Sequence, residues 1–152
     1  MPLLLRDARP DEAPALSDLA MRAKAFWGYD DAFMEACRAE LTLRPADIDA
    51  KPVVVAEADG ALLGFYALGR VDDATTELDD LFVEPGAIGQ GVGRRLMAHA
   101  VEAARRAGYA RLRIEADPFA EGFYQRMGAR RVGEAPSQSI PGRMLPLLLL
   151  DL

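Results

Sequence analysis

Two hydrophobic periods along the chain mark out its strands and helices. Short runs rich in β-branched and aromatic residues predict strands, and apolar residues spaced three and four apart predict helices. Residues 91–107, for example, place Val92, Leu96, Ala100 and Ala104 on one side and charged residues on the other. The predicted strands cover residues 3–9, the two arms of a hairpin within 51–71, 75–83, 110–116, 129–135 and 143–150, and the predicted helices cover 10–26, 31–41, 91–107 and 119–127.

Turn residues separate these elements and fix their order. Asp59-Gly60 joins the two hairpin arms, because this dipeptide supplies the positive φ of a tight turn. Gly108 stands where the C-cap of the preceding helix is expected. The resulting order, β-α-α-β-β-β-α-β-α-β-β, predicts a mixed α/β fold. With no internal repeat or linker, residues 1–152 are predicted to form a single domain.

Composition narrows the class of protein. Hydrophobic residues make up 51% of the chain and charged residues 28%, as in globular proteins. The net charge of −6 argues against nucleic acid as a partner. Because Cys37 and His99 are the only residues of their types, an intrachain disulfide and a Cys- or His-rich metal site are excluded. The apolar runs near the two ends are too short for a signal peptide or a membrane span, so we expect a cytoplasmic protein without a membrane partner.

The stretch EPGAIGQGVGRRLM, residues 84–97, places Gly86, Gly89, Gly91 and Gly93 between a predicted strand and a predicted helix. Glycines leave main-chain N–H groups accessible, and the start of a helix favours negative charge, so the turn indicates a phosphate site. The spacing does not fit a P-loop, because no Lys-Ser/Thr pair follows Gly91. It does not fit a dinucleotide fold either, because no third glycine follows Gly93 at the required spacing.

The segment LFVEPGAIGQGVGRRLM instead resembles the pyrophosphate-binding motif of the GCN5-related N-acetyltransferase (GNAT) family, a strand ending in V-x-P followed by Q/R-x-x-G-x-G/A. FYQRMGARRVGE, residues 123–134, resembles the second motif of that family, F-Y-x-x-x-G-F, and the order of elements is also similar. Ile88 and Ala129 depart from the two motifs, which usually carry Gln or Arg and an aromatic residue there. The resemblance implies a mostly antiparallel sheet of six to seven strands with about four helices, splayed between strands four and five.

This resemblance implies acetyl-CoA as co-substrate and no metal. The pyrophosphate would be bound by main-chain N–H groups at the helix start, and the pantetheine arm would lie against the strand before the turn, where one N–H would polarise the thioester carbonyl. The helix-start residues are Ile88, Gly89, Gln90, Gly91, Val92, Gly93 and Arg94, and the strand residues are Leu81, Phe82 and Val83.

The same resemblance suggests catalytic residues. Tyr124, in the second motif, corresponds to the tyrosine that protonates the leaving thiolate. Glu77 lies where histone-acetylating members carry a glutamate base. Asp79 shares the strand face of Glu77 by the period of two and is expected to contact the acceptor. Asp80 points the other way unless a bulge intervenes, so the base is left open among these three carboxylates and water.

The acceptor is expected near the loop FWGYDD, where Trp27 and Tyr29 can form an aromatic wall. Asp30 can meet a cation or simply cap the next helix, and Arg143 can bind an acceptor carboxylate or a loop. We therefore expect an enzyme that acetylates a small-molecule or peptide amine by direct attack in a ternary complex. A noncatalytic acyl-CoA-binding domain and a nucleotide-binding enzyme are the alternatives. A homodimer is left open, because we expect the last strand to lie at an edge of the sheet, where it could pair between subunits.

Overall fold

The computed structural model describes residues 2–152, which form one seven-stranded sheet and five α-helices. The strand order is β1-β2-β3-β4-β5-β7-β6, and every neighbouring pair is antiparallel except β4 and β5. The strands are β1 (Leu4–Asp7), β2 (Val53–Ala58), β3 (Ala61–Arg70), β4 (Thr75–Val83), β5 (Arg111–Glu115), β6 (Arg130–Pro136) and β7 (Met144–Asp151). The helices are α1 (Ala13–Ala25), α2 (Asp31–Leu41), α3 (Pro45–Ala50), α4 (Val92–Arg106) and α5 (Glu121–Arg126).

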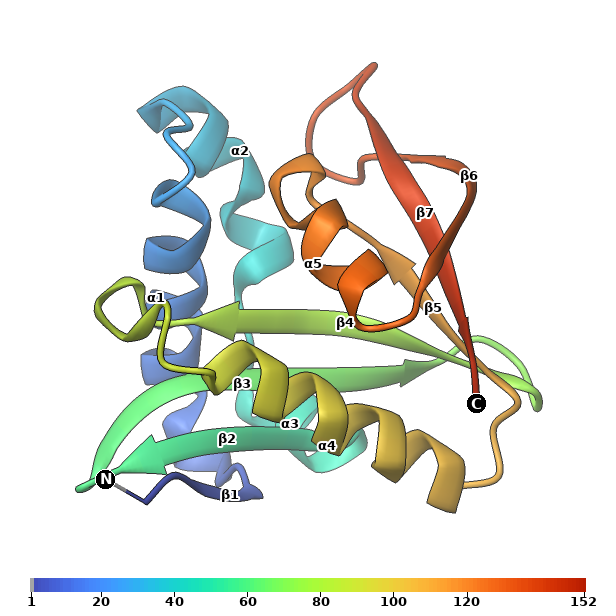
Figure 1. Ribbon diagram of the computed structural model, residues 1–152. Helices are drawn as coiled ribbons and strands as arrows, with labels where there is room; N and C mark the ends of the chain where they lie inside the picture. The colour runs from blue at the N-terminus through green and yellow to red at the C-terminus, as the bar shows by residue number, and fades with distance from the viewer. Residues whose placement is uncertain (1) are drawn as a thin grey trace.

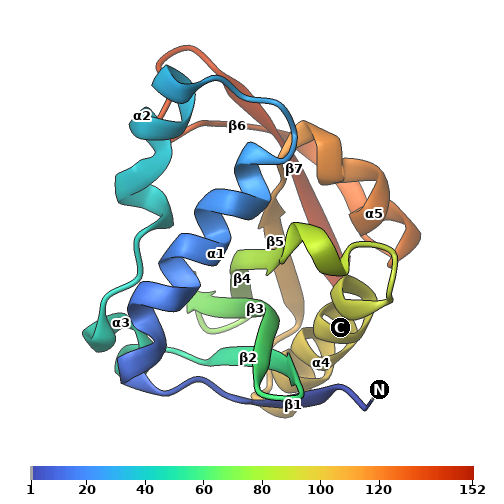
Figure 2. The ribbon, with the colours of Figure 1, turned by 90° about the vertical axis from the view of Figure 1, so that its left-hand side faces the viewer.

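Helices cover both faces of the sheet (Figures 1 and 2). α1, α2 and α3 pack on one face, where Leu16, Cys37 and Ile48 meet Phe65 of β3. α4 and α5 pack on the other face. The core on that face is formed by buried residues of both helices and of the sheet, among them Val54, Tyr66, Leu78, Leu96, Met97, Leu112, Tyr124 and Leu148. Each central strand therefore supplies side chains to two cores by simple alternation.

β4 and β5 separate soon after they meet. Their parallel pairing consists of Thr75 with Arg111, Thr76 with Leu112 and Glu77 with Arg113, and no pair follows in the described chain. Beyond this point β5 continues against β7, up to Glu115. In Figure 1, β4 and β5 diverge at their carboxyl ends. The mostly antiparallel sheet, the splay between strands four and five, and the strand count thus confirm the predicted fold. The predicted edge position of the last strand is wrong, because β7 pairs with both β5 and β6, and β6 lies at that edge.

A β-bulge at Asp79 changes which residues of β4 share a face. The register with β3 pairs Leu68 with Leu78 and then Ala67 with Asp80, so Asp79 has no partner. Without this extra residue, Asp80 would lie on the face opposite Glu77. With it, Asp80 and Glu77 both lie on the side covered by α1, α2 and α3.

The helix α3 was not among the predicted elements. It has six residues, with Pro45 at its start and Asp47 accepting from the main-chain N–H of Arg44 at 2.8 Å. A helix of this length shows too few apolar positions for a period of three to four to be recognised. Within residues 2–152, no helix combines the length and the apolar character needed to cross a membrane.

Candidate functional site

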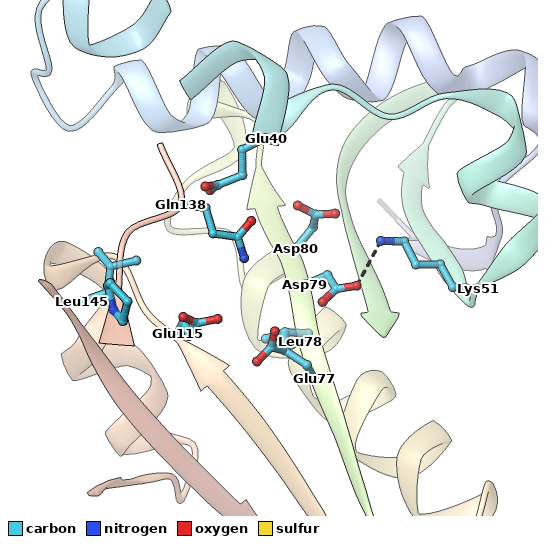
Figure 3. Close-up of a pocket in the computed structure, with 10 residues that line it drawn as sticks. Glu40, Lys51, Glu77, Leu78, Asp79, Asp80, Glu115, Gln138 and Leu145 are labelled. Carbon is cyan, nitrogen blue, oxygen red and sulfur yellow. Dashed lines mark hydrogen bonds and ion pairs between the residues drawn. The ribbon is translucent and has the colours of Figure 1, made fainter. Parts of the chain in front are cut away.

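A cavity of about 310 Å³ lies where β4 and β5 separate (Figure 3). Its lining comes from segments far apart in sequence: the end of α2, the connection between α3 and β2, the bulged part of β4, the end of β5, and the β6–β7 connection with the adjoining strand ends. The lining residues are Glu40, Lys51, Glu77, Leu78, Asp79, Asp80, Glu115, Pro136, Gln138 and Leu145. We refer to this cavity as the acidic pocket, because five of the ten lining side chains are carboxylates.

Most of these carboxylates already have partners. Asp79 forms an ion pair with Lys51 at 3.0 Å, and Glu40 accepts a hydrogen bond from Ser139 at 2.9 Å. Arg113, which lies behind the lining, is shared by Glu77 and Glu115.

Asp80 differs from its neighbours. Its carboxylate forms no ion pair or side-chain hydrogen bond with any residue of the described range 2–152, and it points toward the cavity in Figure 3. Burial raises the pKa of Asp80 to about 7, and the negative charges of Asp79, Glu40 and Asp47 act in the same direction, while Lys51 opposes them. Burial also raises the pKa of Glu77, although Arg113 opposes this shift. Asp80 is therefore the carboxyl group that changes protonation near neutral pH.

Tyr124 lies on the other side of the gap, on α5. Its side chain packs in the core beneath α4 and α5, with 7% of its surface exposed, and its ring makes an edge contact with Phe123. Burial raises the pKa of Tyr124, and the carboxylates of Asp80 and Asp117 raise it further. The hydroxyl therefore stays protonated across the neutral range and lies close enough to Asp80 to sense its charge.

The main chain of β4 has an open edge along the gap. Glu84 donates to the carbonyl oxygen of Leu63 on β3 at 2.8 Å, which fixes the phase of the ladder. Hydrogen-bonded pairs alternate along an antiparallel ladder, so Phe82 is also bonded to β3 while Leu81 and Val83 turn their N–H groups away from it. Since β5 has already separated from β4, Leu81 and Val83 present these groups to the gap.

The glycine turn leaves main-chain N–H groups free at the start of α4. Gly89 and Gly91 have positive φ, 86° and 81°, and a side chain added at either one would meet no atom within 4 Å. Among the described residues, no main-chain or side-chain acceptor receives the N–H groups of Gly89, Gly91, Val92, Gly93 or Arg94. This arrangement fits an anionic group, because free N–H groups and the positive end of the helix dipole converge there.

Two side chains of the turn are open to solvent. Ile88 is 49% exposed, and Arg94 is exposed without a hydrogen bond or ion pair to other described residues. Gly93 differs from the other glycines, since a Cβ there would lie 3.5 Å from Val83 and 3.7 Å from Phe123. The turn is therefore packed directly against the end of β4, beside the gap.

The loop between α1 and α2 is held by a polar cluster. The hydroxyl of Tyr29 donates to Asp117 at 2.9 Å and accepts from Arg143 at 2.6 Å. Lys24 also pairs with Asp117, at 3.2 Å. Burial and the carboxylate of Asp117 raise the pKa of Tyr29 to about 12. Tyr29 and Arg143 thus tie three loops together, so the loop-binding alternative for Arg143 is the one observed.

Other candidates from this loop have different surroundings. Trp27 is 39% exposed and stacks on Phe119, with 5.4 Å between ring centroids. Asp30 caps α2, accepting from the N–H of Phe33 at 2.8 Å. Trp27 therefore lies at the surface, whereas the carboxylate of Asp30 is engaged in capping α2.

The environments of the single histidine and the single cysteine indicate structural roles for both residues. His99 is exposed on α4, and its Nδ1 is 2.7 Å from the hydroxyl of Tyr66, a fully buried residue. Cys37 is buried in the core under α2, and burial raises the pKa of its thiol. No group of three or more His, Cys, Asp or Glu residues within the range 2–152 is arranged to hold a metal ion.

Sequence reasoning missed the charged residues Glu40, Lys51 and Glu115 of the acidic pocket, and also Arg113, which pairs with two of its carboxylates. They belong to no motif, and only the packing of α2, β2 and β5 around β4 brings them together. The bulge did leave a signal: Leu78 and Leu81 are three residues apart, yet both pack in the core beneath α4. In a regular strand that spacing would place them on opposite faces.

Comparisons with known proteins agree on one family. The model of the acetyltransferase (GNAT) family matches residues 14–129. The peptidyl-lysine N-acetyltransferase YjaB of Salmonella typhimurium is 30% identical over 152 residues, covering 99% of this chain and 98% of that protein. Streptothricin acetyltransferase of Streptomyces lavendulae is 39% identical over 70 residues, 45% of this chain and 37% of that enzyme. The match therefore spans little more than a third of the streptothricin enzyme.

The fold has solved counterparts as well. The PaiA N-acetyltransferase of Thermoplasma acidophilum, solved in complex with coenzyme A, superposes with a TM-score of 0.84 over the full length of both chains. At 17% sequence identity, this similarity is one of fold.

The raised pKa of Asp80 predicts a pH-dependent effect on stability. Because the native state binds a proton on Asp80 up to about pH 7 while the unfolded chain releases it near pH 4, the stability of the native state falls as pH rises through this window. Asp80→Asn removes this penalty. Relative to wild type, its free energy of unfolding should increase by on the order of 1 to 2 kcal/mol between about pH 5 and about pH 8. Urea unfolding at several pH values measures the difference.

The matched control is Asp79→Asn, which removes the ion pair with Lys51 and should not become more stable than wild type over this range. A stability difference between Asp80→Asn and wild type that is constant with pH would show that Asp80 titrates at its ordinary pKa.

Proposed function

Because the chain belongs to the GNAT acetyltransferase family, we propose that it transfers an acetyl group from acetyl-CoA to a primary amine by direct attack in a ternary complex. One observation carries the proposal: the open edge of β4 lies between the free N–H groups of the glycine turn and the acidic pocket. An anionic cofactor and a cationic acceptor can therefore approach the same gap from different sides. The named relatives include an enzyme for a small molecule and one for a peptide lysine, so the proposal covers both kinds of amine.

The cofactor side of the proposal rests on the glycine turn and on β4. Acetyl-CoA would supply an activated acyl group in the form of a thioester. The N–H groups of residues 89 and 91–94 would donate to its pyrophosphate, and the exposed Arg94 would add positive charge. In the gap, the N–H groups of Leu81 and Val83 can donate to a carbonyl oxygen and to the pantetheine arm. Phe82, whose N–H faces β3, would contribute packing instead.

The acceptor side rests on the carboxylates of β4. An ammonium must lose a proton before its nitrogen can attack, and a base with a pKa near the working pH removes it best. Asp80 has this property, is free of partners in the described chain and lies on the face of the acidic pocket. Glu77, the base expected from its position in the motif, is held by Arg113. We therefore propose Asp80 as the base and Glu77 as a residue that binds the acceptor.

Tyr124 would assist the departure of the thiolate. Its hydroxyl stays protonated, and the ring is fixed by the core beneath α4 and α5. A thiol has an ordinary pKa of about 8.5, below that of a buried phenol, so complete proton transfer from Tyr124 is uphill. Its main contribution would be a hydrogen bond to the sulfur as negative charge develops there.

The cofactor assignment predicts that bulk in the glycine turn blocks binding. Gly91→Val should weaken acetyl-CoA binding at least tenfold in calorimetry, because the side chain occupies the open space above the free N–H groups. Gly91→Asn should also weaken it, and since Asn accepts positive φ more readily, this variant separates bulk from backbone strain. Gly133→Val, at an open position of β6, is the control and should bind normally. If both Gly91 variants bound acetyl-CoA normally, the glycine turn would not be part of the cofactor site.

The base assignment predicts a distinct pH–rate profile. In wild type, kcat/KM for an accepted amine should rise through about pH 7. Asp80→Asn should lower kcat roughly 100-fold near neutral pH and recover in part at higher pH, where free amine is abundant. Glu77→Gln should act mainly on KM. A larger loss of kcat in Glu77→Gln than in Asp80→Asn would indicate that Glu77, and not Asp80, is the base.

Tyr124→Phe removes the hydroxyl and keeps the ring in the core. We expect kcat to fall by roughly 10- to 100-fold, with acetyl-CoA affinity nearly unchanged. Steady-state kinetics and direct binding measurements test the two parts separately. Full turnover would leave Tyr124 as a packing residue, whereas loss of binding together with turnover would indicate that the hydroxyl holds the cofactor.

A further inference from the structure

The acidic pocket carries more negative charge than one base requires. Among its five carboxylates, Asp79 has Lys51 as a partner, and Glu77 and Glu115 share the single guanidinium of Arg113. Since Asp80 is about half protonated near pH 7, two cations against these five carboxyl groups leave between two and three negative charges without a cation. Carboxylates gathered in a partly buried cavity are costly unless a cation joins them, so the pocket is complementary to a ligand with more than one positive charge.

Glu77 and Glu115, which carry part of the excess negative charge, lie at a distance from Asp80. Glu77 lies three residues before Asp80 on β4, with one residue in the bulge, which corresponds to roughly 7 to 10 Å along the strand. Glu115 lies beside Glu77, since both approach Arg113. An extended alkyl chain advances roughly 1.2 Å per bond, so roughly five to seven carbons between two nitrogens match this separation.

The surface between these charges suits an alkyl chain. Leu78, Pro136 and Leu145 contribute apolar atoms to the lining, and Leu78 is itself part of the core. A cavity of about 310 Å³ lies at the small end of the range for small-molecule sites. The one cation of the lining, Lys51, is engaged by Asp79, so an acceptor carboxylate would find no free positive charge among the lining residues.

We propose that the acceptor is an aliphatic diamine or a longer polyamine, bound with its reacting nitrogen at Asp80 and a second ammonium at the carboxylates of Glu77 and Glu115, beside Arg113. This inference rests on the proposed acetyl transfer. In the reaction, the first ammonium gives one proton to Asp80, and its nitrogen then forms the N–C bond to the acetyl carbon. As the C–S bond breaks and its electron pair goes to the sulfur, the nitrogen releases its second proton to solvent, and the thiolate, hydrogen-bonded by Tyr124, takes up a proton from solvent. The second ammonium undergoes no chemistry. Its role is to orient the chain and add affinity.

The test compares 1,5-diaminopentane with pentylamine, which has the same carbon chain and one charge. Calorimetric titration of each amine into the protein saturated with coenzyme A should show the diamine binding at least tenfold more tightly. With acetyl-CoA, kcat/KM should favour the diamine by the same factor, mostly through KM. Glu115→Gln should remove most of this preference, because it should weaken binding of the diamine more than binding of pentylamine.

The matched control is Glu134→Gln, which makes the same charge change on β6, outside the acidic pocket, and should keep the preference. Equal binding of the two amines, or better turnover of pentylamine or of a lysine-containing peptide, would overturn the inference while leaving acetyl transfer intact. Failure of acetyl-CoA to bind, with the diamine still preferred over pentylamine by the protein alone, would overturn the proposed transfer and support the pocket assignment.

Discussion

The short pairing between β4 and β5 is the constraint on which the rest of the site depends. Three residue pairs hold the two strands together, and the last of them joins Glu77 to Arg113. No pair between β4 and β5 follows in the described chain, so β4 is left with unpaired N–H and C=O groups in the middle of a sheet. Buried main-chain groups without partners are unfavourable, and an extended ligand with amide groups can satisfy them as another strand would. The acidic pocket and Tyr124 both border this opening, and the glycine turn follows directly where β4 ends.

Much of the architecture could be predicted from local sequence signals. The Asp59-Gly60 turn, the amphipathic stripe of residues 91–107 and the glycines before it all act through near neighbours in the chain, and the structure has the corresponding elements. The splay between β4 and β5 was predicted because two motifs resembled those of a known family. The helix α3 was not predicted, because six residues are stabilised by their caps and contacts more than by a visible period.

The electrostatic character of the pocket could not be predicted in this way. Glu77 occupies the position expected of a base, but Arg113, from a neighbouring strand, determines what that carboxylate can do. Asp79 is likewise engaged by Lys51, which precedes it by 28 residues. The distinctive pKa of Asp80 follows from burial and from the absence of such a partner in the described chain. Protonation depends on neighbours in space, and a sequence shows only neighbours along the chain.

Because of the bulge at Asp79, different groups of β4 face different parts of the structure. Side chains of Glu77 and Asp80 face the acidic pocket, those of Leu78, Leu81 and Val83 contribute to the core beneath α4, and main-chain groups of Leu81 and Val83 face the gap. Since every residue type carries the same main chain, substitutions at the pocket-facing positions can change the charge and shape of the acidic pocket while the main-chain edge of β4 stays the same. The pocket can therefore diverge by point mutation, whereas insertion or deletion of one residue would exchange the faces of β4 and disturb the pocket, the core and the edge together.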